Sequence, residues 1–188
     1  MSYLIAAYRY FTFPFAMVFI LLSKMPIHTW HYYYLAIFIS KIPFVFWDFI
    51  RYWFYKFNIR KLWKNVLIMY GVVIQNKDVE IGNNVSLGLY SLIGKCIIGD
   101  DVMFGPYVQI IPGWKNHWFA RLDIPMREQK WVEVPVVIGS DVWIWSWAII
   151  MKNIWKWAIV WAGSIVVNEV ELYTIVWWNP AKIISYRK

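Results

Sequence analysis

The chain of 188 residues is 61% apolar and 16% charged, against roughly 45–50% and 25% in ordinary soluble domains, which excludes long disordered regions. Its length excludes several large domains and predicts one domain with an appendage. Residues 1–64 carry eight Lys or Arg and one acid, Asp48, and so hold most of the formal charge of +8. This asymmetry favours an anionic surface near that segment over a nucleic-acid groove across the fold.

Residues 1–57 are predicted to form hydrophobic, aromatic-rich helices. Residues 3–22 are almost wholly apolar, just long enough to cross a hydrocarbon core, and abundant Tyr, Trp and Phe suit the headgroup boundary. The basic residues that follow, beginning with Arg51, would attract an anionic leaflet. We expect membrane association through this segment, at the inner face of the cytoplasmic membrane. The alternative is a helical collar packed on its own domain or on neighbouring subunits.

In the rest of the chain, apolar residues recur every six positions. Four runs of three carry the repeat: Ile81, Leu87 and Ile93; Ile98, Phe104 and Ile110; Ile138, Ile144 and Ile150; Ile154, Val160 and Val166. A period of six fits neither an amphipathic helix nor a half-buried strand. It is typical of a parallel β-helix, in which one apolar residue per side points inward and three sides complete a coil. We expect this domain to cover residues 58–188.

The position after each inward residue lies at a corner of the predicted coil, where Gly permits positive φ and close approach of neighbouring backbones. Six such positions hold glycine: Gly82, Gly88, Gly94, Gly99, Gly105 and Gly139. Three later ones hold tryptophan: Trp145, Trp155 and Trp161. A bulky ring is a poor occupant of a tight corner. If these Trp residues are genuine, we expect the C-terminal coils to bulge.

The region from residue 81 to 188 resembles the hexapeptide-repeat acyltransferases of the left-handed β-helix class, most closely the polysaccharide, colanic acid and maltose type O-acetyltransferases. Six segments carry the resemblance: 98–106, 116–117, 123–126, 138–144, 162–164 and 179–182. It implies an all-β fold, a left-handed parallel β-helix of hexapeptide repeats. With it we expect the N-terminal hydrophobic helical segment and a short C-terminal helix. It also implies a homotrimer with active sites between subunits, acetyl-CoA as donor and no metal.

The same resemblance bears on the composition, because the chain has 15 Trp and only 9 Gly. The related proteins have Trp at Trp143. They have Gly where this chain has Trp145, Trp147, Trp155, Trp157, Trp161, Trp177 and Trp178, and Trp47 and Trp63 look like further cases. Our hypothesis is that most of these are Gly in the natural protein, through a UGA codon read as Trp.

The repeat stops over residues 111–137, and we expect this inserted loop to be catalytic, because long ordered loops in compact repeats are usually functional. The loop contains His117, the only histidine outside the N-terminal third. Acyl transfer to a hydroxyl needs a base near neutral pH, which imidazole supplies. The resemblance implies that His117 is this base, in a direct transfer within a ternary complex. Asn116 is a candidate to orient the imidazole or the substrate.

Further candidates contact the two substrates. For the sugar or glycan acceptor they are Tyr107, Arg121, Asp123 and Glu133. For acetyl-CoA they are Ser146, Ala162 and Ser164, where the family lines the pantetheine channel with small groups, and Lys182 and Arg187 near the phosphates. If Trp145 and Trp161 are genuine, their rings would crowd that channel.

These features predict an acetyl-CoA-dependent O-acetyltransferase acting on a sugar or polysaccharide precursor. Two alternatives stay open: an N-acyltransferase acting on an amino sugar, and an inactive β-helix scaffold subunit, which the Trp-filled corners favour. A zinc enzyme of the carbonic anhydrase type needs three His ligands, and the repeat region has one.

Overall fold

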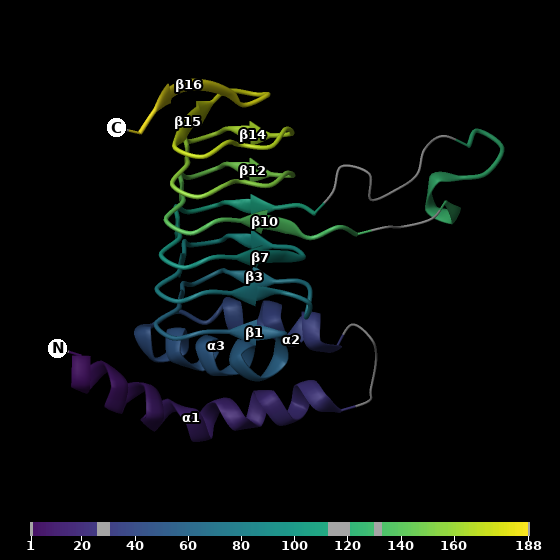
Figure 1. Ribbon diagram of the computed structural model, residues 1–188. Coiled ribbons are helices and arrows are strands. Elements are labelled where there is room, and N and C mark those ends of the chain that lie inside the picture. The colour runs from purple at the N-terminus through teal and green to yellow at the C-terminus, as the bar shows by residue number, and fades with distance from the viewer. Residues whose placement is uncertain (1, 26–30, 113–120, 130–132, 188) are drawn as a thin grey trace.

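The computed structural model describes residues 2–25, 31–112, 121–129 and 133–187. Three helices, α1 (Ser2–Lys24), α2 (His31–Ser40) and α3 (Val45–Asn58), precede a parallel β-solenoid. The helices lie across the N-terminal end of the solenoid, with α1 as the outermost layer (Figure 1). Among the described residues, no helix is both long enough and apolar enough to cross a membrane.

Three parallel sheets form the sides of the solenoid. The first contains β1 (Lys61–Leu62), β4 (Glu80–Ile81), β7 (Cys96–Ile98) and β10 (Val136–Ile138). The second contains β2 (Leu67–Ile68), β5 (Ser86–Leu87), β8 (Met103–Phe104), β11 (Trp143–Ile144), β13 (Ile159–Val160), β15 (Thr174–Trp177) and β16 (Lys182–Tyr186). The third contains β3 (Val73–Ile74), β6 (Leu92–Ile93), β9 (Gln109–Ile110), β12 (Ile149–Ile150) and β14 (Ile165–Val166). The predicted parallel β-helix is confirmed.

The six-residue repeat sets the core. Ile81, Leu87 and Ile93 each point inward from a different sheet and are fully buried. Each inward residue stacks on its counterpart one coil later, as Ile81 does on Ile98 in the register of β4 and β7. Every side of the coil contributes one such column. A second buried position two residues earlier, held in this coil by Val79, Val85 and Ser91, completes the interior.

One side of the solenoid is shortened before Ile154. That residue continues the first sheet through isolated bridges to Ile138 and Val170 instead of a full strand. The side chain of Asn153 compensates, since its Oδ1 accepts the backbone N–H of Val137 at 2.9 Å. A side-chain amide thus replaces a missing peptide group.

The C-terminal end corrects the prediction of a short helix there. Residues Lys182–Tyr186 form β16, which pairs antiparallel with β15. Two adjacent isoleucines, Ile183 and Ile184, and the terminal Tyr186 favour an extended backbone over a helix. The pairing with β15 then supplies the hydrogen bonds that an isolated helix of this length would lack.

Arg51 also departs from the prediction, because its guanidinium is fully buried and faces no solvent. It donates hydrogen bonds to the carbonyl oxygens of Ile39, Ile42 and Ile68 at 3.0–3.2 Å and pairs with Asp48. Burial lowers the pKa of Arg51, while the Asp48 carboxylate acts against that shift. Arg51 therefore joins α2 and α3 to the first coil, and these two helices form a collar on the solenoid.

Candidate active site

The small residues expected near the donor come together at one corner of the C-terminal coils, between the second and third sheets. This open corner is defined by Ser146, Ala162, Gly163 and Ser164. The N–H of Gly163 donates to the carbonyl of Ser146 at 3.0 Å, which stacks the two coils directly. A Cβ built at Gly163 would meet no atom within 4 Å, so the surface is free to receive a ligand there.

Ser164 adds a buried polar group to the open corner. Its Oγ is inaccessible and has no hydrogen-bond partner among the described residues. A buried hydroxyl without a partner is costly, and Ser164 lies two residues before the inward Val166, in the buried position that Ala148 occupies one coil earlier. The open surface at Gly163 fits the pantetheine part of an acyl-CoA, within the space left by the neighbouring rings.

Two tryptophan rings flank this corner. Trp145 and Trp161 project outward, with their ring centroids 6.2 Å apart. The strands around them keep an unbroken register, Ile144 opposite Val160, so the bulge expected for genuine Trp residues is absent from these described coils. The crowding is therefore confined to the outer surface.

The structure separates the two cations expected near the phosphates of the donor. The N–H of Ala181 donates to Ile165 at 2.9 Å, which holds the exposed Lys182 over the coil of the open corner. Arg187 lies instead between the first and second sheets, where its Nη1 contacts Asp141 Oδ2 at 3.1 Å. Lys182 and the open corner are thus together, and Arg187 is apart from them.

The inserted loop leaves the solenoid after β9 and returns at β10, at the corner between the third and first sheets. Residues 121–129 of the loop project far from the coils (Figure 1). Arg121 Nε donates to Asp123 Oδ1 at 3.0 Å, and this contact lowers the pKa of the Asp123 carboxyl and raises that of Arg121. The predicted catalytic pair, His117 and Asn116, lies outside the described residues.

Sequence reasoning missed Gln129, the residue that shapes the loop. Its side chain is buried, and its Nε2 donates to the carbonyl of Arg121 at 2.8 Å. The returning arm of the loop is fixed by Glu133, whose Oε2 accepts from Asn76 Nδ2 at 2.8 Å. Nothing in the spacing of these residues marks such contacts, because they depend on how the loop closes.

Tyr107 lies in the same column of turns as the open corner and does not belong to the loop. Its ring stacks between Tyr90, at 5.1 Å, and Trp147, at 4.1 Å. The acceptor candidates on the loop, Arg121, Asp123 and Glu133, leave the prism at a different corner. Within the described part of one chain, Tyr107 therefore lies near the donor candidates, and the acceptor candidates on the loop do not share a cleft with them.

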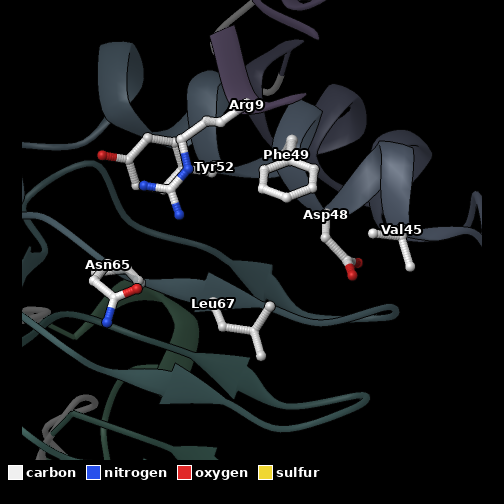
Figure 2. A pocket seen from close by; sticks show the side chains of 8 residues that line it. Arg9, Val45, Asp48, Phe49, Tyr52, Asn65 and Leu67 are labelled. Atoms are coloured by element: carbon white, nitrogen blue, oxygen red, sulfur yellow. The ribbon is translucent and has the colours of Figure 1, made fainter. Parts of the chain in front are cut away.

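A separate hollow of about 310 Å³ lies between the helices and the first coil. Figure 2 shows the side chains that line it, among them Arg9, Asp48 and Tyr52. The Arg9 guanidinium lies 4.3 Å from the centre of the Tyr52 ring. None of the predicted site residues lines this hollow. The described residues also contain no cluster of His, Cys, Asp and Glu that could hold a metal ion.

Comparisons with known proteins agree with the fold. No family model matches the chain. A segment of 53 residues is 51% identical to a chloramphenicol acetyltransferase of Escherichia coli, and 49% identical to one of Agrobacterium fabrum. These matches cover 27% of this chain and only a quarter of each relative.

Solved structures match over a much larger part of the chain. A maltose O-acetyltransferase from Clostridium difficile superposes with a TM-score of 0.67 and 21% identity, over 84% of this chain and 85% of that one. A hexapeptide-repeat acetyltransferase from Vibrio cholerae, complexed with acetyl-CoA, gives 0.70 and 22%, over 84% and 86%. The resemblance to hexapeptide-repeat acetyltransferases is thus confirmed at the level of the fold.

Proposed function

We propose that the chain is an acetyl-CoA-dependent O-acetyltransferase that acts on a sugar or polysaccharide precursor, on a left-handed solenoid. One observation carries the proposal: an inserted loop projects from one corner of the solenoid, while an open corner of small residues lies on another. The acetyl-CoA bound by the Vibrio cholerae structure of the same fold supports the donor.

The active site is completed by a second copy of the chain, in a homotrimer that packs the flat sides of three prisms together. The loop of one subunit reaches the open corner of the next. Two side chains on the loop, Leu122 and Met126, are apolar and exposed. They support this arrangement, because exposed apolar side chains that lie together mark a surface that contacts a partner.

At that interface, His117 takes the proton of the acceptor hydroxyl as its oxygen attacks the thioester carbonyl. The new C–O bond forms, the C–S bond breaks, and the CoA thiolate receives the proton from the imidazolium. Backbone N–H groups hold the oxyanion of the tetrahedral state, and Asn116 orients the imidazole. Ser146, Ala162 and Ser164 line the pantetheine arm, and Lys182 contacts the phosphates. Arg187 reaches the phosphates only if it leaves Asp141.

The acceptor is held by the loop. Arg121 and Asp123 form a charged pair that offers donors and acceptors to hydroxyl groups, and Glu133 and Tyr107 are assigned lesser contacts with the sugar. Transfer to an amino group is the second candidate. It is favoured by the likeness to a perosamine N-acetyltransferase from Caulobacter crescentus, with a TM-score of 0.52, 21% identity, and coverage of 68% of this chain and 51% of that one.

The test measures CoA release with paired acceptors that differ only in a hydroxyl or an amino group. We expect turnover with the hydroxyl sugar, and a loss of roughly 10²–10⁴-fold in kcat for His117→Ala. His28→Ala, which removes a histidine outside the loop, is the matched control. Absence of turnover in the wild-type protein with every acceptor would leave the scaffold alternative standing.

Mixing two inactive variants tests the shared site. His117→Ala removes the base, and Gly163→Trp fills the open corner, at a φ of +70° that Trp147 already tolerates at +65° in the preceding coil. Each homotrimer is inactive. Co-folded together, random trimers regain roughly a quarter of the wild-type sites. If no activity returns, the site lies within one subunit.

A further inference from the structure

We propose that the outer face of α1 binds the surface of an anionic lipid bilayer, with the helix lying in the headgroup layer. This inference concerns a different part of the molecule from the acyl-transfer site. The outer face is defined by Phe11, Pro14, Phe15, Val18, Leu21, Leu22 and Met25.

The inner face of α1 is fixed to α3. Thr12, Ala16 and Ile20, at helical spacing, are buried, and the ring of Phe13 lies 4.9 Å from that of Trp53. Near the helix start, Trp53 Nε1 donates to the carbonyl of Arg9 at 2.8 Å. Near its end, Ser23 Oγ donates to Asn58 Oδ1 at 2.8 Å. Since both ends are held, the opposite face of α1 has a defined direction.

That opposite face is apolar throughout. Phe11 is 62% exposed, Val18 56% and Leu21 61%. A solvent-facing helix of a soluble domain normally places charged residues there, and an apolar patch of this extent marks a partner. In Figure 1, α1 is the layer farthest from the coils, so the face opposite its buried contacts with α3 is directed away from the solenoid. Side-by-side packing of three solenoids therefore leaves it uncovered.

Charge and aromatic content select a membrane as the partner. The Arg51–Asp48 pair is neutral, so the +7 of residues 1–64 comes from other basic side chains, including Lys24, Lys41 and Lys64, which are exposed. These side chains do not lie on the outer face itself, because Lys24 Nζ donates to the carbonyl of Phe57 at 2.9 Å and Lys41 Nζ lies over the ring of Tyr90. An anionic leaflet attracts this end of the molecule as a whole. Exposed Tyr10 and Tyr34 are suited to the headgroup boundary, where an apolar ring and a polar tip are both satisfied.

The test is flotation of the full chain with vesicles of phosphatidylcholine alone or mixed with phosphatidylglycerol. We expect binding to the mixed vesicles, weakening as salt screens the charge, and little binding to phosphatidylcholine. The double variant Phe11→Gln, Val18→Gln should lower the partition coefficient at least about tenfold, because two large apolar side chains no longer enter the bilayer. Ile183→Gln, Ile184→Gln, at the opposite end of the solenoid, is the matched control and should bind as the wild type does.

Equal flotation of the two double variants, or no flotation of the wild type, overturns the proposal. So does an oligomer of the wild-type protein that dissociates in Phe11→Gln, Val18→Gln, because a second copy would then cover the face. Circular dichroism shows that the variants are folded. Acetyl transfer to a soluble acceptor is measured in parallel, so that failure of membrane binding and failure of the proposed activity remain distinguishable.

Discussion

The coils before and after the inserted loop share one core but differ at their corners. In the first region, Gly88 and Gly105 follow inward residues, and in the second Trp145 and Trp161 occupy the same column. The inward residues are equally buried in both regions. The core of a solenoid thus sets its register without help from the corners. A bulky residue at a corner lowers stability only locally.

A second column shows the same contrast at positive φ. Asn65, Asn84 and Asp101 occupy it early, joined by hydrogen bonds of 3.0 and 2.8 Å from each amide to the next residue. Asp141 continues it just after the loop, and Trp157 and Tyr173 occupy it in the last coils, with rings stacked 4.7 Å apart. Asn and Asp tolerate this backbone conformation better than aromatic residues do. Ring stacking therefore compensates in the late coils for what the amide ladder provides in the early ones.

The largest effect is expected at Gly88. A Cβ there would lie 2.3 Å from the carbonyl oxygen of Gly105, which is backbone and cannot move away. Gly88→Ala should lower the free energy of unfolding by about 3 kcal/mol, measured by urea denaturation. Trp145→Gly, in the same column, should change it by less than about 1 kcal/mol. Equal costs at the two sites would show that early and late corners are equally tight.

The amide ladder comes next. Asn84→Ala removes the bonds to Asn65 and Asp101 and puts Ala at a φ of +56°. We expect a loss of about 1.5 kcal/mol in the free energy of unfolding. Asn84→Gly is the control, since it removes the same bonds but accepts the backbone. A loss as large in Asn84→Gly would assign the whole effect to the hydrogen bonds.

Replacing a tryptophan at positive φ is expected to have the opposite effect on stability to replacing Asn84. Trp157→Gly relieves a backbone conformation that favours Gly, at the cost of one ring stack, and should leave stability unchanged or raise it by up to about 1 kcal/mol. Trp143→Gly, in strand β11, should lower it by about 1–2 kcal/mol. Thermal unfolding of both variants gives the comparison. A loss in Trp157→Gly as large as that in Trp143→Gly would contradict it.

The codons at the tryptophan positions test the difference between early and late corners without a stability measurement. The hypothesis of Gly in the natural protein predicts UGA at Trp145, Trp155, Trp157 and Trp161, and UGG at Trp143. UGG at all five sites would end the hypothesis. The late corners would then be a genuine surface of stacked rings.

The smallest effect is expected in the loop that divides the two regions. Arg121→Ala should raise the pKa of Asp123 toward its usual value, because the hydrogen bond from Arg121 holds it down. A depressed carboxyl pKa adds stability above the pKa of the unfolded chain and loses it as pH falls through the folded value. Both side chains are exposed, so the unfolding midpoint at neutral pH should not move. NMR titration of Asp123 measures the shift, and a change in the midpoint would show that the loop supports the coils.

The core could be predicted from the sequence, but the contacts that form only when separate segments of the chain come together could not. The inward positions follow from a local period, and Ile81, Leu87 and Ile93 are buried as predicted. Arg51 was expected at a membrane surface because its charge is visible in the sequence, while the three carbonyls that receive it come from two other segments, the end of α2 and β2. The C-terminal helix was wrong because β16 exists only by pairing with β15. The sequence indicated which residue types the candidate site contains. The role of Gln129 in shaping the loop follows only from its contacts there.

The antiparallel strand β16 has a consequence for assembly. A stack of parallel coils presents the same hydrogen-bonding groups at its last turn as at every earlier one, and so invites another molecule to continue it into a fibre. Reversal of the chain direction in β16 offers the wrong pattern to a following parallel coil. The helical collar closes the other end. End-to-end stacking is thereby opposed along the second sheet at the C-terminal end and by the helices at the other end, which favours association through the sides of the prism.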